Sequence, residues 1–407
     1  MALYDLNKTG RILYCSPIDL SVPNGPGVNE REFVTAMYAA IGDRAHFVVP
    51  HPSLDMPADV SVDQCSYIKP HNHYHPRHFF SHSASITKTI EKVLSQDKYD
   101  LMVFRLGPMP LGFLRLNQIS SVPYVLRHLS TGISSSLSKR GGQIGRALSG
   151  INRRMISKVA RGALVCDVVS HQDIENVSST YNLSKDRIVW IDNSVNTKRF
   201  FPQSSIEAKK LLHLERFSNI AGYVGNYAWR RGAGQLIEAG PTLLKKHPKL
   251  GLLVLGGGDG IVGLQQRAKE LGIASQCVFT GQVAFDLVPA YVNALDVGVS
   301  ILEPAEFAAS EQKVRQYLAC GKPVVATPGS NDFLPQHGLG SLVDTLDISG
   351  IATEIDRWLS MTDTERGQLQ SNAIDYTNTH FAADRMMASR LQLWGDLLDK
   401  KEHRKHD

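Results

Sequence analysis

Short apolar runs alternate with helical stretches along almost the whole chain, and this alternation constrains the fold more than any other feature. A first series of runs has the length and composition of buried strands: Ile12–Cys15, Phe47–Pro50, Leu101–Phe104, Tyr124–Leu126, Ala163–Val168 and Ile188–Ile191. A second series follows: Ile220–Val224, Gly251–Leu255, Val278–Thr280, Val297–Ile301, Pro323–Thr327 and Ser341–Val343. Strand–helix alternation predicts parallel sheets covered on both faces. Two series therefore predict an α/β protein with two doubly wound, Rossmann-like domains.

The length of the chain agrees with two domains. Its 407 residues suffice for two full cores, and 43% hydrophobic with 20% charged residues is typical of a soluble globular protein. The polar stretch Pro202–Glu215 is the predicted boundary, which gives a first domain over 1–205 and a second over 206–381. Residues 382–407 have the pattern of a long amphipathic helix with a basic tail.

The sequence contains no strong membrane or secretion signal. No apolar run approaches the ~18 residues that span a bilayer, because Arg105 and Arg115 interrupt the nearest candidate, Leu101–Leu116. The first ten residues are polar and lack the apolar core of a signal peptide. Five scattered cysteines without a C-x-x-C pair favour reduced thiols. We therefore expect a cytoplasmic protein.

The net charge of +5 is concentrated in one segment. Thr131–Val165 carries seven basic residues and no acid, with apolar residues at helical spacing between them. One interpretation is a domain helix with a solvated basic face. The other is docking to a phosphorylated acceptor or to the anionic inner face of a membrane. The residues that would contact the membrane are Arg153, Arg154, Lys158 and Arg161. Nucleic acid is disfavoured because no aromatic residues accompany the basic ones.

The segment Ser310–Thr327, SEQKVRQYLACGKPVVAT, places a polar stretch, a helix, a Cys-Gly turn and a buried strand in succession. It resembles the donor-site signature S-x-K-x-x-E-Y-x-A-x-G-x-P-V-V-A of the retaining GT-B glycosyltransferases of family 4. The resemblance implies that Lys313 contacts a phosphate of the donor. Gln316 stands where the family has the glutamate that binds the ribose, and an amide accepts hydrogen bonds there without the added strength of a charge.

A second glutamate of the family signature is also replaced, because Ala308 stands at its place. Glu303, Glu306 and Glu311 lie in the same loop. Glu306, two residues from the expected position, is the candidate catalytic substitute. The alternative is a loop glutamate in solvent.

Two further segments resemble the family. Val189–Pro202, VWIDNSVNTKRFFP, resembles the signature that ends the first domain. Gly222–Gly232, GYVGNYAWRRG, resembles the loop that opens the nucleotide domain, with Asn226 and Arg231 at the places of two cations that neutralise the donor diphosphate. Arg231 can bind a diphosphate through two hydrogen bonds. The alternative is a surface loop with solvated arginines.

Glycine-rich turns follow several of the predicted strands. Gly25 and Gly27 precede a helix and resemble the family loop that approaches the donor phosphates and the transferred sugar, although an ordinary strand-to-helix turn has the same pattern. Gly257 resembles the turn under the nucleotide, and Gly281 lies in a strand-end loop whose family counterpart reads the base. Glycine turns alone are weak signals.

Histidines supply one candidate site residue and one cluster. His128 follows a predicted strand, where family members carry a histidine that faces the transferred sugar; packing without a ligand is the alternative. The cluster comprises His71, His73, His75, His78 and His82. Histidine ligates zinc, but the run contains no cysteine or acid, so we favour a polar loop. No D-x-D motif is present, and we expect no metal and no cofactor.

Together these features resemble a GT-B protein whose two domains face a cleft. The resemblance implies a metal-independent, hexosyltransferase-type enzyme. It would move a sugar with retention from a nucleotide-diphosphate sugar to a glycan or lipid-linked acceptor, in surface polysaccharide or glycoconjugate synthesis. Two alternatives stay open. One is a catalytically impaired GT-B protein that acts as a binding or scaffold partner, as Ala308 and Gln316 suggest. The other is a GT-B transferase of a neighbouring family with different donor contacts.

Overall fold

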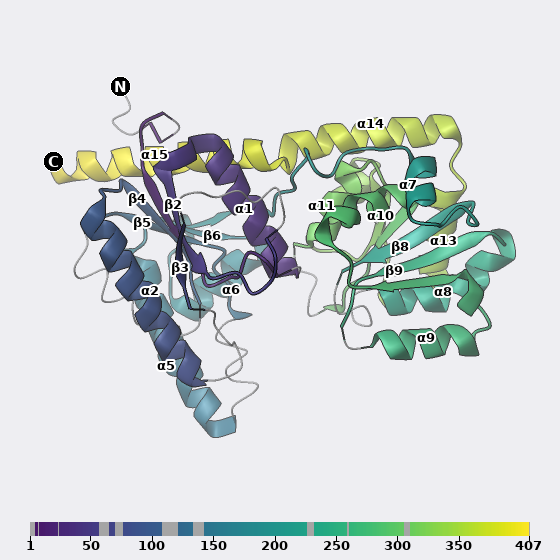
Figure 1. Ribbon diagram of the computed structural model, residues 1–407, viewed down its shortest axis with the longest axis horizontal. Helices are drawn as coiled ribbons and strands as arrows, with labels where there is room; N and C mark the ends of the chain where they lie inside the picture. Colours follow the sequence, from purple (N-terminus) through teal and green to yellow (C-terminus); the bar gives the residue numbers. More distant parts are fainter. Residues whose placement is uncertain are drawn as a thin grey trace. The chain divides into compact units, whose positions relative to one another are not determined.

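The computed structural model describes the chain except residues 1–4, 7, 23, 57–64, 70–75, 108–120, 133–141, 226–231, 259, 305–309 and 407, and the side chains of 76–82, 142–144 and 404–406. The chain divides into two compact units (Figure 1). Unit 1 comprises Met1–Asp192 together with Asp384–Asp407, and unit 2 comprises Asn193–Ala383. The predicted boundary at residue 205 differs from this division because Val195 and Phe200 already pack in a core of unit 2.

Unit 1 contains a seven-stranded parallel sheet with the order β3-β2-β1-β4-β5-β6-β7. Its strands are β1 (Ile12–Cys15), β2 (Ala45–Pro50), β3 (Cys65–Ile68), β4 (Leu101–Arg105), β5 (Tyr124–Arg127), β6 (Cys166–Val168) and β7 (Ile188–Trp190). β1 lies inside the sheet, where Ile12 pairs with Ala45 of β2 on one side and with Leu101 of β4 on the other.

Helices cover both faces of this sheet. They are α1 (Gly25–Ile41), α2 (Pro76–Gln96), α5 (Gly142–Gly162), α6 (His171–Tyr181) and α15 (Ala383–His406), with short 3₁₀ turns at Gly42–Arg44 and Lys185–Arg187. Alternate strand residues such as Leu13 and Cys15 face a core formed with α2, α5 and α6. On β1 the residue between them, Tyr14, packs against Phe33 of α1, with ring centroids 4.9 Å apart.

Unit 2 contains a six-stranded parallel sheet with the order β10-β9-β8-β11-β12-β13. Its strands are β8 (Asn219–Val224), β9 (Leu250–Leu255), β10 (Cys277–Gly281), β11 (Val297–Ser300), β12 (Val324–Ala326) and β13 (Gly340–Leu342). Counted within the unit, this is the strand order 3-2-1-4-5-6 of dinucleotide-binding folds. The direction of progression reverses between β8 and β11.

Two helical layers sandwich this second sheet. The helices are α7 (Ser205–Leu211), α8 (Ala233–Lys246), α9 (Ile261–Glu270), α10 (Val288–Ala294), α11 (Gln312–Ala319), α12 (Phe333–Gln336), α13 (Ile348–Leu359) and α14 (Asp363–His380), with 3₁₀ turns at Ala274–Gln276 and Phe285–Leu287. Ala221 and Tyr223 of β8 face the core with α8, α9 and α13, whereas Ile220 and Val224 face the core with α10, α11 and α14. The period of two along the strand thus produces both layers.

The predicted fold class is confirmed, since each predicted strand overlaps an observed one and both sheets are parallel. Sequence reasoning missed β3, which has four residues and a partly exposed edge position. Among the described residues, no helix combines the length and the apolarity needed to span a bilayer.

Helix α5 buries its apolar face within unit 1. Its apolar residues Met155, Ile156 and Val159 are buried within unit 1, and Ile156 and Val159 belong to its core. They are therefore not available for insertion into a membrane. The basic residues of the helix are exposed, as predicted: Arg153, Arg154, Lys158 and Arg161. Ile151, 48% exposed, is the one large apolar side chain beside them in the described part of α5.

Candidate functional site

The strand order of unit 2 indicates a ligand site at the carboxyl ends of β8 and β11. In open α/β sheets, ligands bind outside the carboxyl ends of the strands where the strand order reverses. β8 and β11 are hydrogen-bonded neighbours at this reversal, and their carboxyl ends are Val224 and Ser300. Gly225 follows β8 with φ +144°, a conformation that side chains rarely adopt.

Lys313 lies at this reversal point. Its Nζ donates to Glu311 Oε1 at 2.8 Å and lies 4.3 Å from the centroid of the Tyr223 ring on β8. A Cβ added to Gly225 would lie 3.3 Å from Lys313 Cε, so the glycine allows the lysine stem to lie against the end of β8. Both charged side chains are almost buried, with 8% of Lys313 and 3% of Glu311 exposed.

Glu311 connects the lysine to the neighbouring strand. Its other carboxylate oxygen accepts a hydrogen bond from the Ser300 hydroxyl at the end of β11. Glu311 has an extended backbone and immediately precedes α11, so Lys313 occupies the first turn of that helix. A helix N-terminus favours anions, and the ammonium group adds a full positive charge there. The end of β8, the end of β11 and the start of α11 thus form a setting suited to an anionic ligand.

The other predicted donor residues of unit 2 lie on neighbouring elements. Gly256 donates its N–H to the carbonyl of Gly281 at 3.0 Å, which links the carboxyl ends of β9 and β10 beside Gly257. Gly281 has φ +65°. Gln316 is buried in α11, three residues after Lys313 and so on the same side of the helix. Lys313, Gln316, Gly257 and Gly281 therefore all lie in unit 2.

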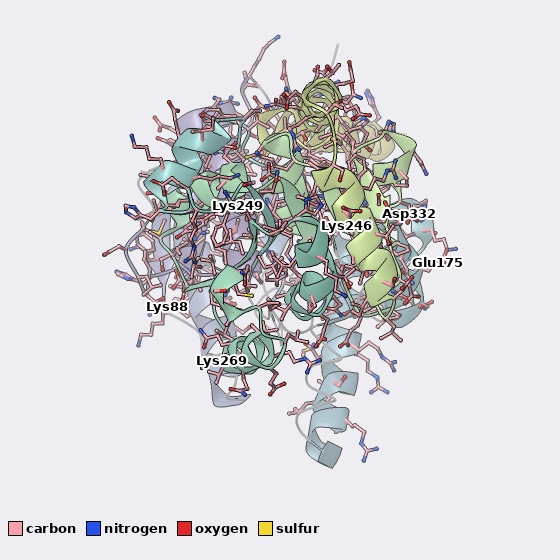
Figure 2. All side chains as sticks on the ribbon, turned by 90° about the vertical axis from the view of Figure 1, so that its right-hand side faces the viewer. Lys88, Glu175, Lys246, Lys249, Lys269 and Asp332 are labelled. Atoms are coloured by element: carbon pink, nitrogen blue, oxygen red, sulfur yellow. The ribbon has the colours of Figure 1, made fainter. Side chains whose placement is uncertain are left out.

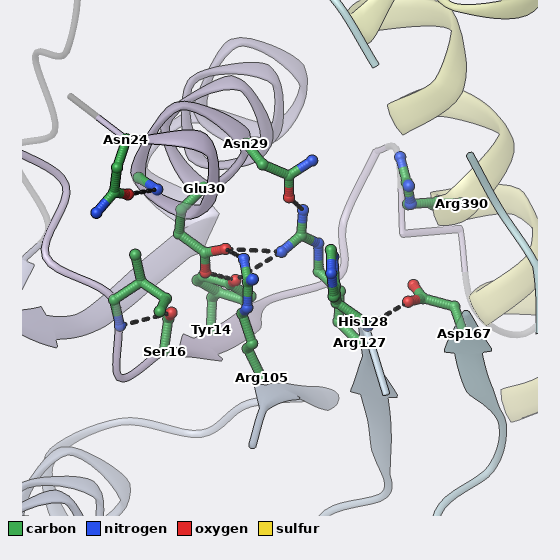
Figure 3. A network of polar contacts seen from close by, with 12 residues as sticks. Tyr14, Ser16, Asn24, Asn29, Glu30, Arg105, Arg127, His128, Asp167 and Arg390 are labelled. Carbon is green, nitrogen blue, oxygen red and sulfur yellow. Dashed lines mark hydrogen bonds and ion pairs between the residues drawn. The ribbon is translucent and has the colours of Figure 1, made fainter. Parts of the chain in front are cut away.

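Unit 1 contains a buried network of charges at the carboxyl edge of its sheet (Figure 3). Glu30 of α1 is fully buried and accepts hydrogen bonds from Tyr14, Arg105 and Arg127, the last at 2.8 Å. Burial alone raises the pKa of a carboxyl group, but Arg105 and Arg127 outweigh it and lower the pKa of Glu30 from 4.5 to about 2. The network ties α1 to three neighbouring strands.

His128 follows β5 at the edge of this network. Its backbone has φ +56°, and its N–H donates to the carboxylate of Asp167 on β6. Burial and the nearby arginines Arg105, Arg127 and Arg390 lower the pKa of the imidazole well below 6.5, so the ring is neutral at pH 7. Asp167 is buried, and burial raises its pKa, whereas Arg390 is the largest influence that lowers it.

The two predicted glycines of unit 1, Gly25 and Gly27, differ in how much space surrounds an added Cβ. Asn24 caps α1 by accepting from the Gly27 N–H at 2.8 Å. A Cβ on Gly27 would lie 2.1 Å from the Val22 carbonyl oxygen, so the turn itself requires a glycine at this position. Gly25 is exposed, and no described atom lies within 4 Å of an added Cβ.

Several predicted residues lie outside the described residues: Asn226, Arg231, Glu306, Ala308, His71, His73 and His75. Their roles stay predictions. His78 and His82 lie in α2, within the part of the helix whose side chains are not described. Within the described ranges, no group of three or more histidine, cysteine, aspartate or glutamate side chains could hold a metal ion.

Sequence reasoning missed two features of the site. It noted Glu311 but favoured Glu306, and it did not pair Glu311 with Lys313. The polar pair Ser310–Glu311 before a helical pattern is a helix-start signal that could have placed Glu311 outside the helix. The Glu30 network joins residues from four separate elements and has no local signature.

This chain is similar to known glycosyltransferases in sequence and in structure. Residues 218–361 match the family described as Glycosyl transferases group 1. An uncharacterized glycosyltransferase of Methanocaldococcus jannaschii is 27% identical over 297 residues, which cover 70% of this chain and 73% of the relative. A GDP-mannose-dependent alpha-(1-6)-phosphatidylinositol monomannoside mannosyltransferase of Mycolicibacterium smegmatis is 26% identical over 231 residues, 54% of this chain and 59% of the relative.

A solved structure shares the fold over nearly the full length. Sucrose-phosphate synthase from Thermosynechococcus elongatus superposes with a TM-score of 0.71 at 20% identity, covering 95% of this chain and 99% of that structure. At this identity the likeness concerns the fold alone. The shared fold is the GT-B fold of two parallel-sheet α/β domains.

Proposed function

We propose that this chain, whose residues 218–361 match the Glycosyl transferases group 1 family and whose fold is GT-B, moves a hexosyl group from a nucleoside-diphosphate sugar to a glycan or lipid-linked acceptor. The transfer proceeds with retention at the anomeric carbon and serves the synthesis of surface polysaccharide or glycoconjugates. The observation that carries the proposal is Lys313 at the strand-order reversal of unit 2: its Nζ lies over the Tyr223 ring, and its stem lies against Gly225. A nucleotide diphosphate is the anionic ligand that binds at such a position.

In the proposed reaction, the bond between C1 of the sugar and the diphosphate oxygen breaks while an acceptor hydroxyl forms the new bond to C1. The acceptor proton passes to the departing diphosphate. Lys313 stabilises the negative charge that grows on that diphosphate, with Arg231 as a second cation. Gln316 binds the ribose, and the backbone near Gly257 and Gly281 surrounds the nucleotide. Glu306 remains a candidate for the sugar side of the site.

Unit 1 supplies the acceptor side in this proposal. His128 has a pKa well below 6.5, so its neutral ring can exchange hydrogen bonds with hydroxyl groups of the transferred sugar. Gly25, exposed at the start of α1, leaves room for the sugar or the phosphates to approach the backbone. The scaffold alternative is not favoured, because a protein without turnover has no need for the lysine–glutamate pair at the strand-order reversal.

A donor screen tests the proposal. The relative from Mycolicibacterium smegmatis is named for GDP-mannose, and one structural neighbour is a complex with UDP and glucose, so the screen includes UDP-, GDP- and ADP-sugars. A sugar nucleotide at 100 times its Kd stabilises a folded protein by about 2.7 kcal/mol, which shifts the melting temperature measurably. Mass spectrometry of the product with the stabilising donor then detects transfer or hydrolysis. Absence of both binding and turnover with every donor would contradict the proposal.

Chelation is expected to leave the activity unchanged. Lys313, and Arg231 by the family resemblance, provide the positive charge that a metal ion supplies in other transferases. The measurement is the rate of transfer in EDTA compared with the rate in added manganese or magnesium. A complete loss in EDTA that either metal restores would contradict this mechanism and would make the histidine cluster in 71–82 the first place to search for a metal.

The basic face of α5 is the proposed docking surface for an anionic membrane. Arg153, Arg154, Lys158 and Arg161 are exposed. Each basic residue near an anionic leaflet contributes about 1 kcal/mol. Because Met155, Ile156 and Val159 are buried in unit 1, the interaction depends on charge, with Ile151 as the apolar side chain beside it.

We expect the protein to sediment with vesicles that contain phosphatidylserine and to lose this binding in high salt, because screening shortens the reach of surface charges. Arg153→Gln with Arg154→Gln should weaken the binding at least tenfold. The matched control, Lys88→Gln with Lys92→Gln on α2, removes two exposed cations from another helix and should retain it (Figure 2 labels Lys88). Equal sedimentation with neutral and anionic vesicles would exclude the membrane and leave a phosphorylated acceptor as the partner.

A further inference from the structure

The final helix of the chain brings a buried arginine to the edge of the unit 1 sheet. Arg390 of α15 is 5% exposed, and its guanidinium lies 5.5 Å from the centroid of the Phe33 ring of α1. Its Nη2 donates to the Asp192 carbonyl at 3.4 Å. Figure 3 shows Arg390 above the carboxylate of Asp167, which lies beside His128. The proposed reaction does not use Arg390 or Asp167.

His128 has an unusual backbone that Asp167 holds in place. Three non-glycine residues among those described have a positive φ: His128, Asn182 and His213. Asn182 ends α6, and His213 lies in the turn after α7, so both have local reasons for this conformation. His128 instead follows a strand. The Asp167 carboxylate accepts from the His128 N–H, and the Asp167 carbonyl accepts from the Leu129 N–H at 2.9 Å.

Several buried polar atoms around His128 have no hydrogen-bond partner among the described residues. Within the described part of the chain, His128 Nδ1, Asp167 Oδ2 and Arg390 Nε are buried and have no hydrogen-bond partner. A sparsely populated backbone conformation costs about 1–3 kcal/mol and tends to persist at functional sites, where surrounding contacts hold it. Buried polar atoms without partners are likewise uncommon in packed interiors. Both observations coincide at the residue that the proposed function places against the sugar.

We propose that Asp167 and Arg390 are positioning residues for sugar transfer: Asp167 holds the left-handed backbone of His128, and Arg390 of the final helix is the cation that faces the Asp167 carboxylate and the His128 ring. The inference rests on the proposed role of His128. It makes the C-terminal helix part of the acceptor-side machinery. Burial raises the pKa of Asp167, and Arg390 is the largest influence that opposes this, which agrees with the arrangement. Burial in turn lowers the pKa of Arg390 to about 10.

Two variants of Asp167 separate positioning from structural support. Asp167→Asn keeps an oxygen that can accept from the His128 N–H, whereas Asp167→Ala removes it. Displacing a contacting group by about 1 Å can cost about a hundredfold in rate. We therefore expect Asp167→Ala to lower kcat roughly ten- to a hundredfold. We also expect an unchanged KM for the donor, whose nucleotide binds in unit 2, and recovery of most of the rate in Asp167→Asn. Equal kcat in both variants would overturn the proposal.

Arg390→Met tests the contribution of the helix, with Arg385→Met, an exposed arginine of α15, as its matched control. The cations that lower the pKa of the His128 ring are Arg105 of β4, Arg127 of β5 and Arg390 of α15, and the Asp167 carboxylate of β6 lies beside the same residue. Losing one cation should raise the pKa of His128 and shift the acid limb of the pH–rate profile to higher pH. Arg385→Met should leave both unchanged. Equal shifts in the two variants would contradict the proposal.

A readout without turnover keeps this inference separate from the proposed function. NMR of protein with ¹⁵N-labelled histidine reports the His128 amide and the titration of its ring in the free chain. If no donor is turned over, the proposed function fails, but the His128 amide signal should still move in Asp167→Ala and the ring titration in Arg390→Met. An unchanged spectrum in folded variants, checked by thermal unfolding, would overturn the inference by itself.

Discussion

Replacing Glu30 by Gln is expected to lower the free energy of unfolding of unit 1 by about 3–5 kcal/mol, the usual cost of breaking a buried ion pair on one side. Glu30 is fully buried and binds the guanidinium groups of Arg105 and Arg127, which are 10% and 5% exposed. The substitution leaves two buried cations without their shared anion. Because the chain has two units, amide exchange in peptides from β4 and β5 measures the effect better than a global melting curve.

Glu175→Gln is the matched control for this prediction. Glu175 pairs with Lys185, and the side chains are 67% and 58% exposed, as the surface position of Glu175 in Figure 2 illustrates. Exposed pairs contribute about 0–1 kcal/mol, so the same chemical change should have little effect here. A similar small loss in both variants would show that the Glu30 network does not stabilise unit 1.

The same network predicts how the stability of unit 1 depends on pH. The pKa of Glu30 is lowered from 4.5 to about 2 in the folded protein. A carboxyl group with a lowered pKa contributes stability that is complete above its unfolded value and is lost as the pH falls toward the folded value. The contribution of Glu30 is therefore present above pH 4.5 and decreases between pH 4.5 and about 2. In Glu30→Gln, the free energy of unfolding of unit 1 should therefore change less with pH between pH 4.5 and about 2 than it does in the wild type.

The strands were predictable from sequence because each is a short apolar run between helical stretches, and parallel strands buried on both faces have that pattern. The missed strand β3, Cys65–Ile68, pairs only with β2 at the edge of the sheet and is partly exposed. The end of unit 1 also escaped prediction. The Val195 carbonyl accepts from the Ala383 N–H at 3.0 Å. This contact joins segments that are far apart in the sequence, so no local change in composition predicts it.

Position in a signature segment made some residues candidates from the sequence alone, whereas long-range contacts could not be predicted. Lys313 became a candidate because it lies in such a segment, and its contact with a donor phosphate stays a prediction. Its pairing with Glu311 was not predicted, since residues two apart do not face each other on a helix. Glu311 reaches Lys313 because it precedes the helix with an extended backbone. Likewise, Glu30 is located in a polar stretch of α1 that suggests a solvated face, yet Asn29–Glu32 is buried throughout.

Lys313→Met is expected to weaken the binding of UDP or GDP by about tenfold or more, because a hydrogen bond to a charged group contributes roughly 1.5–3 kcal/mol and 1.4 kcal/mol corresponds to tenfold. Methionine retains an apolar stem against Tyr223 while removing the charge. Lys269→Met, an exposed lysine of α9 labelled in Figure 2, is the control and should bind as the wild type does. Calorimetry at fixed salt measures both affinities.

A second substitution separates lost binding from lost stability. Lys313→Met leaves the carboxylate of Glu311, 3% exposed, without its cation, and this buried negative charge also repels a diphosphate. Adding Glu311→Gln removes that charge, so the double variant should regain thermal stability and part of the affinity, but not the affinity of the wild type. If Lys313→Met remains folded and binds UDP and GDP as tightly as the wild type does, Lys313 does not contact the diphosphate. The reversal between β8 and β11 would then lose the positive charge on which the proposed donor site depends.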